Sequence, residues 1–122
     1  MKPEVKALWL EALRSGKYIQ GIETLRKEIL PSRILEHCCL GVLCDLHSKE
    51  TGGVWEEGWK GKYTYYGKDT FPPQCVIEWA GLQNQVFDTG DVRVFQHKSL
   101  SNLNDEGKSF AEIADIIEEG VY

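Results

Sequence analysis

The chain has 122 residues, 42% hydrophobic and 27% charged, with a formal net charge of −5. This length fits one domain and excludes a second, independent catalytic domain. No stretch reaches the ~18 apolar residues of a membrane span, and the charged start is unlike a secretory signal. We therefore expect one cytoplasmic domain over residues 1–122, with no membrane association.

The charge lies mainly at the C-terminal end. Residues 104–122 contain six acidic residues and one lysine, which account for the whole net charge. Such an end repels phosphates and disfavours binding to duplex nucleic acid. We interpret it as a solvated helix face, with an acidic docking surface for a basic partner as the alternative.

The first predicted helix begins at Pro3, which suits a first turn, and ends at Ser15-Gly16. Apolar residues at positions 5, 8, 9, 12 and 13 form one stripe along it. Residues 18–22 look extended. The pattern predicts a short helix over residues 25–30, ended by Pro31.

A buried helix is predicted from Cys38 to His47. Gly41 in its interior costs about 1 kcal/mol against Ala and therefore indicates close packing on another backbone. Residues 54–66 are typical of a β-hairpin. A short helix follows Phe71-Pro72-Pro73 and ends at Gly81.

Residues 84–96 are predicted to form a second hairpin with its turn at residues 88–91. A short helix begins at Leu100 and stops near Gly107. Ser109 and Glu112 fit a capping box that starts the last helix. These elements predict an α+β fold in which four to five helices pack on one small antiparallel sheet or on hairpins.

The cysteines could have three roles. Cys38, Cys39 and Cys44 lie within seven positions and Cys75 stands alone, which indicates reduced thiols in a cytoplasm rather than a disulfide framework. The absence of any Cys-x-x-Cys spacing disfavours zinc, and free Cys packs well in a core. We expect core packing and no metal or cofactor. The alternative is a thiol nucleophile at Cys38 or Cys39, with His97 as base and Asp88 or Asp91 behind it.

Residues 59–68 are the best candidate for a binding surface. They hold three lysines and four aromatic residues and no acid. Aromatic rings stack on bases and lysine binds phosphate, so a nucleotide or short single strand would fit. The alternative is a hairpin with one face in the core and edge lysines that block aggregation. The candidate ligand-binding residues are Trp59, Lys60, Lys62, Tyr63, Tyr65, Lys68 and Arg93.

Several motifs together carry a resemblance. The run Cys38–Leu46 resembles the Cys-Cys-Leu-Gly-Val-Leu-Cys-Asp-Leu core of small proteins of unknown function from phages and prophages. The segments Trp9–Gly16, Tyr18–Gly21, Val76–Leu82 and Leu103–Phe110 match other motifs of that group. Ile29–His37 departs from it by being longer than the usual short turn. No catalytic role transfers, because the group has none established.

Small phage accessory proteins often act by binding, which the resemblance implies here only by analogy. We expect a non-catalytic counter-defence protein that sequesters a nucleotide signal or inhibits a host defence protein, in the host cytoplasm. A Cys-dependent hydrolase or transferase, and a structural or regulatory protein that forms homo-oligomers, are the alternatives.

Overall fold

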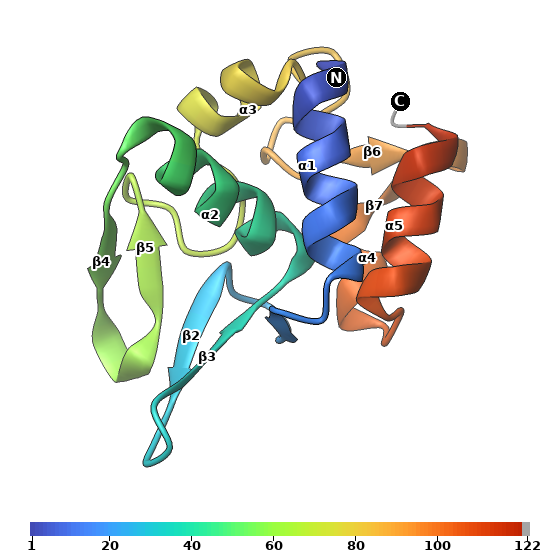
Figure 1. Ribbon diagram of the computed structural model, residues 1–122. Coiled ribbons are helices and arrows are strands. Elements are labelled where there is room, and N and C mark those ends of the chain that lie inside the picture. The colour runs from blue at the N-terminus through green and yellow to red at the C-terminus, as the bar shows by residue number, and fades with distance from the viewer. Residues whose placement is uncertain (121–122) are drawn as a thin grey trace.

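The computed structural model describes residues 1–120, apart from the side chain of His97. Figure 1 shows helices gathered around one core, with two hairpins at one side of it. The α-helices are α1 (Pro3–Arg14), α2 (Cys39–Thr51), α3 (Gln74–Ala80), α4 (Leu100–Asp105) and α5 (Phe110–Glu119). The α+β class and the expected helix number are confirmed. No helix in this part of the chain is long and apolar enough to cross a membrane.

The strands of residues 1–120 form three small sheets. In the first, β3 (Ile34–His37) lies between β1 (Ile19–Gln20) and β2 (Arg26–Ile29), parallel to β1 and antiparallel to β2. The other two are antiparallel pairs. They consist of β4 (Trp55–Glu57) with β5 (Tyr63–Tyr65), and of β6 (Arg93–Val94) with β7 (Lys98–Ser99).

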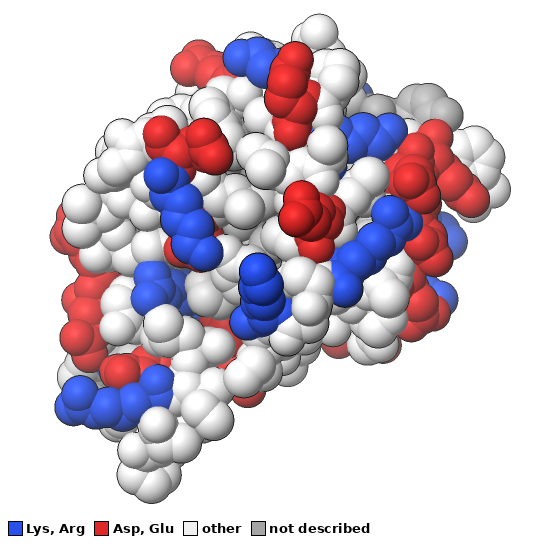
Figure 2. Space-filling view, in the orientation of Figure 1, with Lys and Arg blue, Asp and Glu red and all other residues white. Residues whose placement is uncertain are grey.

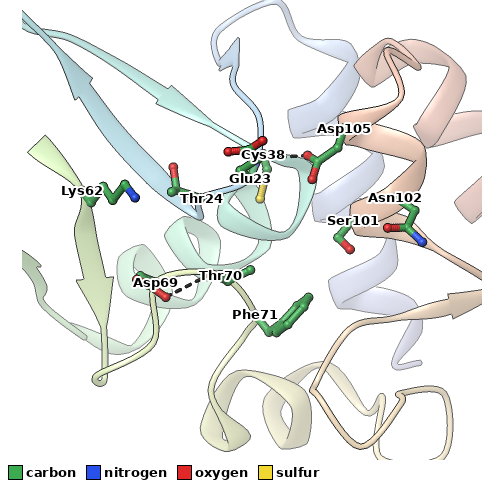
Figure 3. A pocket seen from close by; sticks show the side chains of 10 residues that line it. All are labelled: Glu23, Thr24, Cys38, Lys62, Asp69, Thr70, Phe71, Ser101, Asn102 and Asp105. Atoms are coloured by element: carbon green, nitrogen blue, oxygen red, sulfur yellow. Dashed lines mark hydrogen bonds between the residues drawn. The ribbon is translucent and has the colours of Figure 1, made fainter.

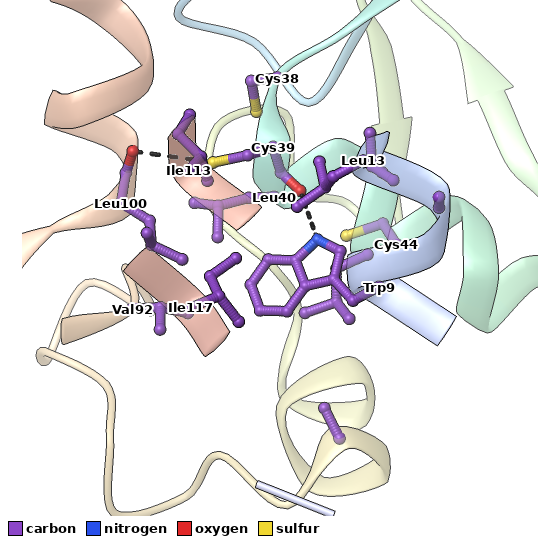
Figure 4. Packing of buried hydrophobic residues seen from close by; sticks show 14 of the residues in the cluster. Trp9, Leu13, Cys38, Cys39, Leu40, Cys44, Val92, Leu100, Ile113 and Ile117 are labelled. Carbon is purple, nitrogen blue, oxygen red and sulfur yellow. Dashed lines mark hydrogen bonds between the residues drawn. The ribbon is translucent and has the colours of Figure 1, made fainter. Parts of the chain in front are cut away.

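The core lies where α1, α2 and α5 meet (Figure 4). Trp9 of α1 is fully buried, and its indole N–H donates to the Cys39 carbonyl over 3.0 Å. This bond satisfies the polar group of a large core side chain. Fully buried neighbours come from α2 and α5, among them Leu40, Leu43, Ile113 and Ile117.

Helices α1 and α5 run side by side (Figure 1) and join the two ends of the chain. The Arg14 guanidinium lies 2.8 Å from Asp115 and 3.0 Å from Glu118. Figure 2 shows acidic side chains gathered along α5 with basic ones beside them. The acidic end is therefore partly paired within the chain.

The predicted helix over residues 25–30 is wrong, because residues 26–29 form strand β2. Each β2 residue pairs with a β3 residue, from Arg26 with His37 to Ile29 with Ile34. A six-residue helix has few internal hydrogen bonds to offset its nucleation cost, so pairing with β3 wins. The long segment before Cys38 is this hairpin.

The predicted hairpin over residues 84–96 forms from its turn as far as Gln85 and Arg93, where the Arg93 amide donates to the Gln85 carbonyl over 2.8 Å. Val86 and Val92 form an isolated bridge, and the Phe87 amide donates to the Asp91 carbonyl over 2.8 Å. Beyond it, β6 pairs with β7. The second arm of the predicted hairpin therefore also pairs with β7, the segment before α4.

Candidate functional site

A cleft of about 420 Å³ opens between the β2–β5 side of the molecule and α4 (Figure 3). Separate segments line it: the loop before β2, the start of α2, the start of β5, the loop after β5, and α4. Figure 3 shows Glu23 and Asp105 near Cys38 on one side, with Asp69, Thr70 and Phe71 opposite. The lining residues are Glu23, Thr24, Cys38, Lys62, Asp69, Thr70, Phe71, Ser101, Asn102 and Asp105.

The loop before β2 is fixed by a backbone contact with α2. A Cβ atom on Gly41 would lie 1.7 Å from the Leu25 carbonyl oxygen, so only glycine allows this approach. The Leu25 amide donates to the Asp69 carbonyl over 2.7 Å. Through these contacts Thr24 and Asp69 reach the same cleft. The prediction that Gly41 packs on another backbone is confirmed.

Asn104 fastens α4 behind the cleft. Its side-chain oxygen accepts hydrogen bonds from the Cys39 amide at 3.1 Å and from Gln20 Nε2 at 2.9 Å. Its Nδ2 donates to the Gly21 carbonyl over 2.8 Å. One buried amide thus joins α4, α2 and the end of β1, which fixes the α4 wall against the opposite loops. The sequence carries no signal for this role.

Asp91 holds Ser101, which lines the cleft. Its Oδ1 accepts from the backbone amides of Val92 at 2.9 Å and Ser101 at 3.2 Å. Its Oδ2 accepts a short hydrogen bond from the Ser101 hydroxyl. Asp91 is buried. These three hydrogen bonds connect it to Val92, next to β6, and to Ser101 on α4. Its carboxylate therefore orients Ser101.

The cleft is polar and carries net negative charge. Glu23, Asp69 and Asp105 supply three carboxylates, and Lys62 supplies one ammonium group. Among residues 1–120, no ion pair involves any of these four side chains. Asp105 Oδ1 accepts from the Glu23 amide over 2.9 Å, and Asp69 accepts from the Thr70 hydroxyl over 3.0 Å. Asp105 Oδ1 also accepts from Asn104 Nδ2 over 3.3 Å, and no other hydrogen bond to these three carboxylates is formed by the residues that the structure describes, which leaves acceptor capacity for a ligand.

The cysteines occupy core positions. Cys38, Cys39 and Cys44 are buried, and burial raises the pKa of Cys38 to about 11 and those of Cys39 and Cys44 well above the usual value. A thiol that resists ionisation is a poor nucleophile. Cys38 borders the cleft, but its thiol would be protonated at neutral pH. The prediction of buried packing cysteines is confirmed; the histidine side chain proposed as their base lies outside the described groups.

No group of three or more His, Cys, Asp or Glu side chains in the described residues could hold a metal ion. The three cleft carboxylates are therefore spread over the walls. This spacing suits hydrogen bonds to separate parts of a larger ligand.

The structure separates the seven candidate residues of the sequence analysis. Only Lys62 lines the cleft. Tyr65 is fully buried, with its hydroxyl 2.6 Å from His47 Nδ1, so its prediction as a ligand contact is wrong. Hydrophobic burial of one hairpin face has determined its position.

The other candidates lie apart. Tyr63 is half-buried under the Arg26 guanidinium, 4.5 Å from the ring centroid. Trp59 is 79% exposed, and Lys60 lies 5.6 Å from its ring centroid. Lys68 is exposed near the turn after β5. Arg93 lies on β6, where its guanidinium donates to the Asn84 carbonyl over 2.6 Å. In Figure 1, β6 is on the opposite side of α2 from β4 and β5. Arg93 therefore does not lie next to residues 59–68.

A second polar cluster lies under the β4–β5 hairpin. The Asp45 carboxylate accepts from the Tyr18 hydroxyl at 2.5 Å and from Trp55 Nε1 at 3.1 Å. His37 lies edge-on between the Tyr18 and Trp55 rings, with no hydrogen-bond partner for either ring nitrogen. Burial lowers the pKa of His37 to about 4. This cluster is structural packing next to the cleft wall.

Fold and cleft together define a small α+β protein with a polar cleft that is held in place by hydrogen bonds between distant segments. The chain matches the family described as "Domain of unknown function (DUF8296)" over residues 1–121, and it belongs to that family. It matches no curated protein and no solved structure.

Proposed function

We propose that this protein is a non-catalytic binding protein that captures a small polar ligand in the 420 Å³ cleft. The observation that carries the proposal is a concave site whose polar groups come from separate segments held by Asn104, Asp91 and the Gly41 contact. The volume lies within the roughly 300–1,000 Å³ of small-molecule sites, and the lining, which is more polar than that of most such sites, suits a polar ligand.

The lining chemistry defines the ligand class. Carboxylates accept from hydroxyl and amino groups, and the hydroxyls and amide of Thr24, Ser101 and Asn102 can both donate and accept. Phe71 offers an aromatic surface, and Lys62 is the one cation in the lining. A ligand with several donors, a flat ring and at most one phosphate fits these groups. A nucleoside or nucleoside monophosphate combines them.

The resemblance to phage proteins supports a counter-defence role for this activity, in which the protein sequesters a nucleotide signal in the host cytoplasm. The cleft, and not residues 59–68, provides the site. A ligand with several phosphates is disfavoured because it would bring like charges against Glu23, Asp69 and Asp105.

Two other hypotheses receive less support. Inhibition of a host protein through the acidic last helix is weakened because Arg14 already pairs with Asp115 and Glu118. A Cys-dependent enzyme is weakened by the burial and raised pKa of the thiol at the cleft.

Isothermal titration with nucleosides, nucleoside monophosphates and triphosphates tests the proposal. We expect a nucleoside or a monophosphate to bind in the micromolar range, and the matching triphosphate to bind at least about tenfold more weakly. Asp69→Asn should weaken binding roughly 10- to 100-fold, because a hydrogen bond to a charged group contributes about 1.5–3 kcal/mol.

Asp88→Asn is the matched control, since Asp88 is an exposed carboxylate outside the cleft, and it should bind like the wild type. Equal melting temperatures would show that both variants fold. A protein that binds none of these compounds below about 1 mM, or an Asp69→Asn variant that binds as tightly as the wild type, would overturn the proposal.

A further inference from the structure

One face of the β1–β3–β2 sheet is only partly covered by the other residues that the structure describes. Side chains of paired residues share a face of a sheet, and alternate residues of a strand return to it. The register pairs Lys27 with Glu36 and Ile29 with Ile34, so these four share one face. Ile19 joins them, because β1 pairs it with Glu36. The opposite face carries His37 and Arg26, which pack on Trp55.

The partly covered face, formed by Ile19, Lys27, Ile29, Ile34 and Glu36 and called the isoleucine face, exposes large apolar side chains to solvent. Ile19 is 49% and Ile34 is 44% exposed, and neighbouring Ile22 is 56% exposed. Two hollows lie along it, of about 170 Å³ beside Ile22 and about 330 Å³ beside Ile29, and Lys27 lines both. A two-stranded arm with an apolar face open to water is marginally stable by itself, so covering this face would stabilise it.

Lys27 and Glu36 carry opposite charges at paired positions of the isoleucine face, and Lys62, which forms a bridge with Lys27, adds a positive charge at the edge of this face. Lys27 and Glu36 lie opposite each other on adjacent strands, and neither forms an ion pair with a residue in the described range. A strongly acidic or strongly basic partner would leave one of the two facing a like charge. A second copy of the same face can satisfy both at once.

We propose that the isoleucine face is a homodimer interface. A twofold axis that runs parallel to the strands, between β2 and β3, places β2 of one protomer over β3 of its partner. Lys27 then faces Glu36 of the partner subunit, and Ile29 faces Ile34 of the partner subunit. Each contact occurs twice, as an isologous interface requires. The two ion pairs lie side by side at one level of the strands, and the Ile29–Ile34 contacts lie next to them, two residues further along.

Sedimentation equilibrium from about 5 to 500 µM tests the association. The face is small, so we expect a reversible dimer with a dissociation constant in the micromolar range. Ile34→Asp should weaken it at least about tenfold. Val54→Asp is the matched control, because Val54 is 71% exposed outside this face, and it should associate like the wild type. A wild-type chain that is monomeric at every concentration overturns the proposal.

Charge exchange identifies the pairing. Lys27→Glu and Glu36→Lys should each be monomeric, because like charges would meet across the axis. An equimolar mixture of the two should form a heterodimer, in which residues 27 and 36 of opposite charge face each other in both contacts. Circular dichroism of each variant checks that the hairpin is intact. A mixture that stays monomeric while both variants are folded contradicts the proposed axis.

Discussion

Gly41 shows how a single residue positions the cleft. Its missing side chain lets α2 approach the backbone of Leu25, and a Cβ atom there would lie 1.7 Å from a carbonyl oxygen. The neighbouring atom is backbone, so it cannot rotate away as a flexible side chain could. Thr24, next to Leu25, lines the cleft. The packing of one glycine therefore determines the position of a binding wall.

Gly41→Ala should destabilise the protein by about 2–3 kcal/mol or more, because overpacking moves backbone in a close-packed core. Urea denaturation measures the change. Gly67→Ala is the matched control, with open space around it and a φ of +80°, and it should cost about 1 kcal/mol through the left-handed conformation alone. A Gly41→Ala variant no less stable than Gly67→Ala would contradict the packing argument.

At the scale of elements, the last helix depends strongly on its own sequence. Ser109 accepts from the Glu112 amide and Glu112 accepts from the Ser109 amide, both over 3.1 Å, as the capping box predicts. One face of α5 then buries Phe110, Ile113 and Ile117. Local hydrogen bonds and the apolar period agree, which explains why the pattern predicts this helix correctly.

Ser109→Ala should lower the free energy of unfolding by about 1 kcal/mol, because it leaves the Glu112 amide without its cap. The midpoint of urea denaturation measures the loss. Glu112→Gln keeps an acceptor for the Ser109 amide, as a capping box with Gln does, and should change the midpoint less. Equal losses for the two variants would show that the hydroxyl cap has no separate effect.

The whole molecule responds to acid through buried histidines. Burial lowers the pKa of His37 to about 4, while the unfolded chain keeps a value near 6.5. The unfolded state therefore binds the proton first as the pH falls. The free energy of unfolding should decrease between pH 6.5 and pH 4, by at most about 3 kcal/mol for this residue. Burial also lowers the pKa of His47, which adds loss in the same direction.

Urea denaturation at pH 7, 5.5 and 4.5 tests this expectation. His37→Gln should reduce the loss of stability between pH 7 and 4.5 more than His47→Gln does, because the pKa of His37 is shifted far below its usual value. A His37→Gln variant with the pH dependence of the wild type would contradict the assignment. Below about pH 4, protonation of Asp45, whose Tyr18 hydrogen bond lowers its pKa against the opposing effect of burial, adds a further loss.

Sequence patterns alone were enough to predict α1, α2, α3, the β4–β5 hairpin, α5 and the burial of Cys38, Cys39 and Cys44. Each of these follows from local features, such as an apolar period, a helix cap, a helix stop or the preference of a residue type for the core. Such features depend only on residues that are close together in the sequence. Tertiary structure decided that residues 26–29 form a strand, that β6 pairs with β7 and that Tyr65 faces the core.

The cleft belongs to the second group. Its residues come from positions 23 to 105 of the chain, and contacts across long sequence separations, such as those of Asn104 with Gln20 and Cys39, bring them together. Local propensity cannot predict such contacts, because the free energy that stabilises them is gained only when distant segments pack. The sequence therefore indicated the elements, and the packing of distant segments decided where a ligand could bind.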